Sequence, residues 1–128
     1  MSINNSAAIL LFDYKKRILM QHRTEDALHA PGYWSFFGGA IEKGENPDVA
    51  VRRECLEELD YSLENPKLIL VNKFNGETRF IFAEKYNKFK SLELLEGQAM
   101  GWFSIDDALK LKSIEGDDGI LNQIKGKY

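Results

Sequence analysis

The sequence predicts an α+β fold in which helices cover a mixed β-sheet. The 128 residues, 44% of them hydrophobic, are enough for a domain with a core of its own. Strand-like and helix-like segments alternate along the chain, and no linker or repeat interrupts them. Asn75-Gly76 lies between two β-rich runs, which is typical of an antiparallel hairpin. We therefore expect one domain over residues 1–128.

The first elements are expected to form a second hairpin. Ala7 to Phe12 is a continuous apolar run, Asp13 to Lys16 is polar, and Arg17 to His22 resumes the apolar pattern. A loop over residues 24–33 follows, and Trp34 to Phe37 is expected to be one short aromatic strand that ends in Gly38-Gly39.

The segment Pro47 to Leu59 is expected to be a helix. Asn46 can cap it, Pro47 suits its first turn, and Asp60 takes the left-handed position at its end. At about 100° per residue, Val49, Leu56 and Leu59 share one side, which we expect to face the core.

The remaining elements follow the same signals. The expected segments are strands over Lys67–Phe74 and Glu77–Tyr86, a strand over Met100–Phe103, a helix capped by Ser104 that runs to Leu111, and a terminal helix over Asp117–Ile124. Trp34, Phe36, Phe37, Phe74 and Trp102 are interpreted as sheet core or as walls for a planar group.

The charge balance excludes several classes of protein. Lys and Arg number 17 and Asp and Glu number 20, so the formal net charge is −3. A weakly acidic chain without a basic block argues against binding to polymeric nucleic acid or to anionic membranes. The single cysteine cannot form an internal disulfide, and the apolar runs are too short to span a membrane. These features favour a cytoplasmic location.

Three acids of the predicted helix share one face. Glu54, Glu57 and Glu58 fall within an arc of roughly 100°, where like charges repel one another. A divalent cation would reverse that interaction, and carboxylate oxygens suit Mg²⁺ or Mn²⁺. The alternative is a solvated acidic helix face. Gly38-Gly39 can turn tightly and bring a bare carbonyl near the helix, or it can be an ordinary strand-to-helix turn.

The spacing of these residues resembles the signature of the Nudix hydrolase family. Its elements are Gly39, five residues, Glu45, seven residues, Arg53-Glu54-Cys55, one residue, and Glu57-Glu58, within the segment Gly39–Tyr61. Asp60 occupies the usual final glycine position. The resemblance implies an α/β/α sandwich and metal-dependent hydrolysis of a nucleoside diphosphate linked to another group.

The resemblance also implies roles for individual residues. Glu54, Glu57 and Glu58 would bind the metal ion, the Gly38 carbonyl is a further candidate, and Gly39, Glu45 and Arg53 would be structural. Glu96, in Glu96-Gly97-Gln98, resembles the downstream segment of MutT-type members, where it would be a metal ligand or a base. Arg23 would contact a substrate phosphate. The alternatives are a loop acid for Glu96 and a surface cation for Arg23.

The expected activity is that of a pyrophosphohydrolase that depends on Mg²⁺ or Mn²⁺. Water would attack a phosphorus of a diphosphate linkage in a nucleoside triphosphate or another nucleoside diphosphate derivative. One role that this activity could serve is MutT-like nucleotide clean-up. Glu54 is the first choice for the base and Glu96 the second. The alternatives are a nucleotide-sensing module without turnover and an acidic structural helix without metal. The expected partner is a small nucleotide, and a homodimer is expected only from the general frequency of symmetric dimers among small enzymes.

Overall fold

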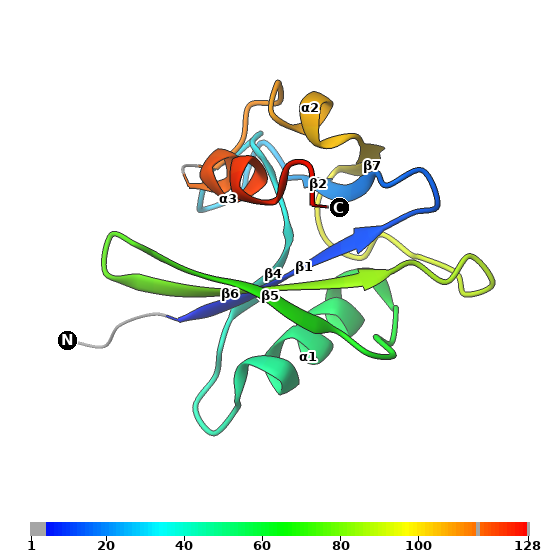
Figure 1. Cartoon of the computed structure of the whole chain (residues 1–128). Helices are drawn as coiled ribbons and strands as arrows, with labels where there is room; N and C mark the ends of the chain where they lie inside the picture. The colour runs from blue at the N-terminus through cyan, green and yellow to red at the C-terminus, as the bar shows by residue number, and fades with distance from the viewer. Residues whose placement is uncertain (1–4, 115, 128) are drawn as a thin grey trace.

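Helices lie on both faces of a seven-stranded sheet in the computed structural model, which describes residues 5–114 and 116–127 (Figure 1). The strands are β1 (Ser6–Phe12), β2 (Ile18–His22), β3 (Trp34–Ser35), β4 (Phe37–Ala40), β5 (Lys67–Phe74), β6 (Glu77–Lys85) and β7 (Ala99–Phe103). The helices are α1 (Pro47–Leu59), α2 (Ile105–Ala108) and α3 (Asp117–Ile124).

Strand β1 lies at the centre of the sheet. The strand order is β3-β2-β1-β6-β5, with β4 also paired to β1 and β7 to β2. The β1 and β6 strands are parallel, whereas the β1–β2, β1–β4 and β5–β6 pairs are antiparallel. Because both faces of β1 are buried, its sequence is a continuous apolar run rather than an alternating one.

The two faces of the sheet carry separate hydrophobic clusters. Ala8, Leu10 and Phe12 belong to the cluster under α2 and α3, whereas Ile9 and Leu11 belong to the cluster under α1. Figure 1 shows α1 on one side of the sheet and α2 and α3 on the other. The predicted α+β fold, an α/β/α sandwich with a mixed sheet, is therefore confirmed. Across the described ranges, no helix is long and apolar enough to cross a bilayer.

The expected single strand over Trp34–Phe37 is wrong. Strand β3 pairs with β2, and β4 pairs with β1, so Phe36 separates two strands that have different partners. Gly38 and Gly39 lie inside β4 instead of forming a turn after the strand. The chain changes partner here because β2 and β4 pair with opposite ends of β1.

The expected helix from Ser104 to Leu111 is shorter than predicted. Ser104 caps α2 as expected by accepting a hydrogen bond from the Asp107 N–H, but the helix ends at Ala108. The Lys112 carbonyl accepts a hydrogen bond from the Trp34 N–H, and Ser113 forms a bridge with Trp34. The chain therefore leaves the helix in order to pair with β3.

Helix α1 has its expected ends but a different buried side. Asn46 accepts the Val49 N–H at 2.9 Å, and the helix ends at Leu59. Val49 and Leu56 are each 47% exposed, so the prediction that they face the core is wrong. The buried side contains Ala50, Val51, Cys55, Glu58 and Leu59. The helix thus packs on the sheet along a side that includes one of its acids, Glu58.

Asp60 ends α1 in a left-handed conformation, with φ 50° and ψ 38°. Replacing Asp60 with glycine is expected to raise the free energy of unfolding by up to about 1 kcal/mol, because glycine adopts this conformation without a steric penalty. Urea denaturation measures the change. Asp60→Ala is the control, since alanine retains the Cβ atom and is expected to be less stable than glycine at this position.

Candidate active site

Strand β4 brings two glycines against β1 and α1. A Cβ atom on Gly38 would lie 2.2 Å from the Ala7 carbonyl oxygen, and the Gly38 φ is 145°. A Cβ atom on Gly39 would lie 2.6 Å from Oε1 of Glu54. The glycines therefore let the strand approach its neighbour and leave room for a carboxylate directly against the backbone.

The three glutamates of α1 lie in different environments. Glu58 is 3% exposed, and its Oε1 accepts a hydrogen bond of 2.8 Å from the Gly38 N–H. The Glu54 side chain is 15% exposed and the Glu57 side chain 58% exposed. The Gly38 amide group makes this hydrogen bond to the helix. The proposed role of the Gly38 carbonyl as a metal ligand therefore stays a prediction.

Burial and mutual repulsion perturb these acids. The pKa of Glu58 is raised to about 9, mainly by burial and then by the negative charges of Glu96 and Glu54, against the opposing effects of the Gly38 N–H and the positive charge of Arg23. Burial also raises the pKa of Glu54, against the opposing effect of Arg53. Carboxylates from α1 and from the segment before β7 are thus close enough to interact.

The metal-free protein is expected to lose stability as the pH rises. Glu58 has a higher pKa in the folded state than in the unfolded state, so its contribution falls between about pH 4.5 and pH 9. We expect the free energy of unfolding to drop by about 2–3 kcal/mol from pH 5.5 to pH 8. Urea denaturation in EDTA measures this change. Glu58→Gln should flatten the profile, and an equal slope in that variant would contradict the assignment to Glu58.

Arg53 joins the loop before α1 to the acids of the helix. Its Nε lies 2.7 Å from Oε2 of Glu45, and a second nitrogen lies 2.9 Å from Oε1 of the same residue. The guanidinium also contacts Glu54 at 3.0 Å, Glu57 at 3.2 Å and the Ala40 carbonyl at 3.1 Å. These hydrogen bonds lower the pKa of Glu45 and raise that of Arg53 above its usual range. One side chain thus fixes the loop, β4 and the acidic face relative to one another.

Two hydrogen bonds place Glu96 beside the end of α1. The Gln21 side chain donates to the Glu96 carbonyl at 2.8 Å, and the Leu95 N–H donates to the Glu58 carbonyl at 2.9 Å. Both bonds hold the backbone, and the Glu96 side chain is exposed. The distant segment predicted from Glu96-Gly97-Gln98 therefore lies next to the helical acids.

Arg23 lines a hollow of about 220 Å³ beside Gly38 and Gly39. Its Nε donates to the His29 carbonyl at 2.9 Å, which orients the guanidinium. Phe36 and Phe74 also line this hollow, unlike Trp34, Phe37 and Trp102. The hollow thus combines a cation with aromatic rings next to the acidic face.

The sequence prediction missed Arg79, which also lines this hollow. Its guanidinium forms an ion pair of 2.6 Å with Asp117, which is fully buried at the start of α3. Within residues 5–114 and 116–127, the Asp117 Oδ2 atom has no hydrogen-bond partner. The available signal in the sequence was a single arginine next to the apolar run of β6. Its partner, Asp117, lies 38 positions further along the chain, so the ion pair could not be predicted from the local pattern.

The donor set suits a divalent cation of the Mg²⁺ or Mn²⁺ type. The available groups are carboxylate oxygens, two of them on acids whose pKa is raised, and Gly39 leaves space for one against the backbone. In the part of the chain that the structure describes, no three Asp, Glu, His or Cys side chains yet form a metal-binding group. Glu54 and Glu57 each accept a hydrogen bond from Arg53.

The fold and this cluster define an α+β domain in which a loop and helix hold several carboxylates against a mixed sheet. A family model described as the NUDIX domain matches residues 3–124. The chain belongs to the Nudix hydrolase family.

Solved structures with the same fold include MutT proteins. One, from a study of MutT in Aliivibrio salmonicida and Vibrio cholerae, has a TM-score of 0.84 at 23% identity, with 99% of this chain and 100% of that chain covered. A MutT Nudix hydrolase from Burkholderia pseudomallei has a TM-score of 0.78 at 24% identity, with 98% and 100% covered. An Ap4A hydrolase from C. elegans has a TM-score of 0.75 at 19% identity, with 98% and 97% covered.

Proposed function

We propose that this protein is a pyrophosphohydrolase that requires Mg²⁺ or Mn²⁺ and cleaves a diphosphate linkage in a nucleoside triphosphate or another nucleoside diphosphate derivative. The observation that supports this most is that Glu58 bonds to Gly38 and Glu54 lies against Gly39, two glycines that line the same hollow as Arg23. Membership of the Nudix family and the MutT-like fold agree with it.

The acids are proposed to hold the cation. Glu54, Glu57, Glu58 and Glu96 are the proposed side-chain ligands, with the Gly38 carbonyl as a further candidate. When bound, the cation supplies positive charge that lets an acidic face accept a polyphosphate and that lowers the pKa of a water molecule. Arg53 holds Glu54 and Glu57 in place, since it bonds to both carboxylates.

The remaining residues are proposed to bind substrate and move a proton. The Arg23 guanidinium binds a phosphate oxygen, and the rings of Phe36 and Phe74 contact the nucleoside part. Glu54 accepts the proton of the attacking water, with Glu96 as the second choice. The water oxygen bonds to phosphorus as the anhydride bond breaks, which releases a nucleoside monophosphate from a triphosphate together with pyrophosphate.

A substrate panel tests this proposal. Purified protein with Mg²⁺ or Mn²⁺ is incubated with nucleoside triphosphates, oxidised triphosphates, nucleotide sugars and dinucleoside polyphosphates, and the products are identified by mass spectrometry. Metal-dependent release of a nucleoside monophosphate supports the proposal and names the substrate class. Binding without turnover across the panel would instead support a nucleotide-sensing module.

A further inference from the structure

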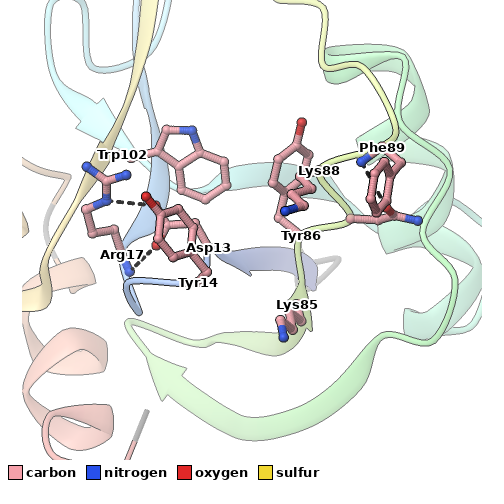
Figure 2. Close-up of a pocket in the computed structure, with 9 residues that line it drawn as sticks. Asp13, Tyr14, Arg17, Lys85, Tyr86, Lys88, Phe89 and Trp102 are labelled. Carbon is pink, nitrogen blue, oxygen red and sulfur yellow. Dashed lines mark hydrogen bonds and ion pairs between the residues drawn. The ribbon is translucent and has the colours of Figure 1, made fainter.

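A second hollow lies near the end of β1 that is further from Gly38 and Gly39. Figure 2 shows the side chains that line it. It has a volume of about 710 Å³, within the range of sites that hold small molecules. Its lining residues are Asp13, Tyr14, Arg17, Lys85, Tyr86, Asn87, Lys88, Phe89 and Trp102. Gly38 pairs with Ala8 and Lys85 pairs with Phe12, so the two sites are about 13 Å apart along β1.

Aromatic rings form the wall and the rim of this hollow. The Trp102 and Tyr86 rings lie 5.3 Å apart between centroids, and Figure 2 shows them between Tyr14 on one side and Phe89 on the other. Tyr14 is 78% exposed and Phe89 is 89% exposed. Two large rings left in water at the rim of one hollow indicate a surface that receives a planar group.

The charges that line the hollow favour an anion. Among the described residues that line the hollow, Arg17, Lys85 and Lys88 are the cations and Asp13 is the single acid. The Asp13 carboxylate already bonds to Arg17 at 2.7 Å. Lys85 and Lys88 form no ion pair with any residue that the structure describes. An incoming phosphate would therefore meet two lysines without an ion pair among the described residues, while the acid of the hollow, Asp13, is already bonded to Arg17.

The turns that carry the two exposed rings are held by hydrogen bonds. Asp13 accepts the Arg17 N–H at 2.8 Å and the Lys15 N–H at 3.0 Å, which orders the turn around Tyr14. Asn87 accepts the Phe89 N–H at 3.0 Å and donates its own N–H to the Tyr61 hydroxyl at 3.0 Å. A lysine lies over each ring, with Lys15 5.6 Å from Tyr14 and Lys88 5.5 Å from Phe89. Ordered turns reduce the entropy that binding costs.

We propose that this hollow is a second binding site for a nucleotide-sized molecule that carries a planar ring and a phosphate. The rings of Tyr14, Phe89 and Trp102 contact the planar group, and Lys85 and Lys88 bind the phosphate. The site is independent of the proposed hydrolysis, because it contains none of the acids of α1.

The test uses AMP and GMP as probes on ¹⁵N-labelled protein in EDTA, where the acids of α1 repel a phosphate. The two tryptophan indole signals report on different places, since Trp102 lines the hollow and Trp34 stacks on His22. We expect the Trp102 indole and the amides of Tyr86, Asn87 and Phe89 to shift and saturate. Shifts confined to Gly38 and Gly39, or no shift at all, would overturn the proposal.

Three variants separate the contributions. Lys85→Glu with Lys88→Glu, and Tyr14→Ala with Phe89→Ala, should each weaken AMP binding at least about tenfold. Lys73→Glu makes the same type of charge change on β5, outside this hollow, and should leave the affinity unchanged. Inorganic phosphate should bind at least about tenfold more weakly than AMP. Equal affinity for AMP and inorganic phosphate would show that the rings contribute nothing to binding and would overturn the proposal.

Discussion

Glu58→Gln is expected to lower turnover of the substrate found in the panel by at least about tenfold. Glutamine keeps an oxygen for the 2.8 Å hydrogen bond from the Gly38 N–H, but it removes the negative charge proposed to hold the cation. In the metal-free protein the same change removes a buried acid whose pKa is raised to about 9. We therefore expect lower activity together with higher stability at pH 8.

Steady-state kinetics and urea denaturation on the same preparation measure both effects. Glu93→Gln is the matched control, because Glu93 is exposed on the segment before β7 and its backbone N–H donates to the Leu59 carbonyl of α1, a hydrogen bond that the substitution retains. That variant should match the wild type in both measurements. Wild-type turnover in Glu58→Gln would remove Glu58 from the proposed site.

Gly38→Ala is expected to destabilise the protein by at least about 3 kcal/mol. The new Cβ atom would lie 2.2 Å from the Ala7 carbonyl oxygen and 2.7 Å from the Ala8 Cα atom, which are backbone atoms of the central strand. The φ of 145° adds strain for any residue with a side chain. Relief of this clash requires β4 to separate from β1.

Urea denaturation and the soluble yield measure the loss. Gly44→Ala isolates the conformational strain, since Gly44 has a φ of 88° but no described residue beyond its chain neighbours lies within 4 Å of an added Cβ. We expect that control to lose about 1 kcal/mol. Similar stability of the two variants would mean that β4 adapts without cost.

Local signals predicted the elements, and the unpredicted features depend on distant partners. Helix α1 begins and ends as expected because Asn46, Pro47 and Asp60 act within a few residues of themselves. The division of Trp34–Phe37 into two strands depends on β1 and β2, which no local pattern in that segment reveals. The expectation that Val49 and Leu56 face the core was wrong because the buried side of α1 includes Glu58, which accepts a hydrogen bond from Gly38 of β4, a partner outside the helix.

The candidate site likewise contains some residues that could be predicted from the sequence and others that could not. The acids of α1 and the bond between Arg53 and Glu45 could be predicted because they lie within one motif. The ion pair between Arg79 and Asp117 joins β6 to the start of α3, and nothing in either segment alone identifies the other. Spacing in a single sequence therefore locates the proposed catalytic groups better than the groups around the proposed nucleoside pocket.

The central position of β1 has a consequence for how the chain folds. This strand pairs in parallel with β6, whose partner residues lie about 70 positions later, as in Ser6 with Arg79. During synthesis the first apolar strand stays without its parallel neighbour until β6 has left the ribosome. Closure of such a long loop costs entropy before any of these contacts form, so the high contact order predicts slow folding. Conditions that slow translation or hold the chain unfolded leave this apolar segment free to aggregate.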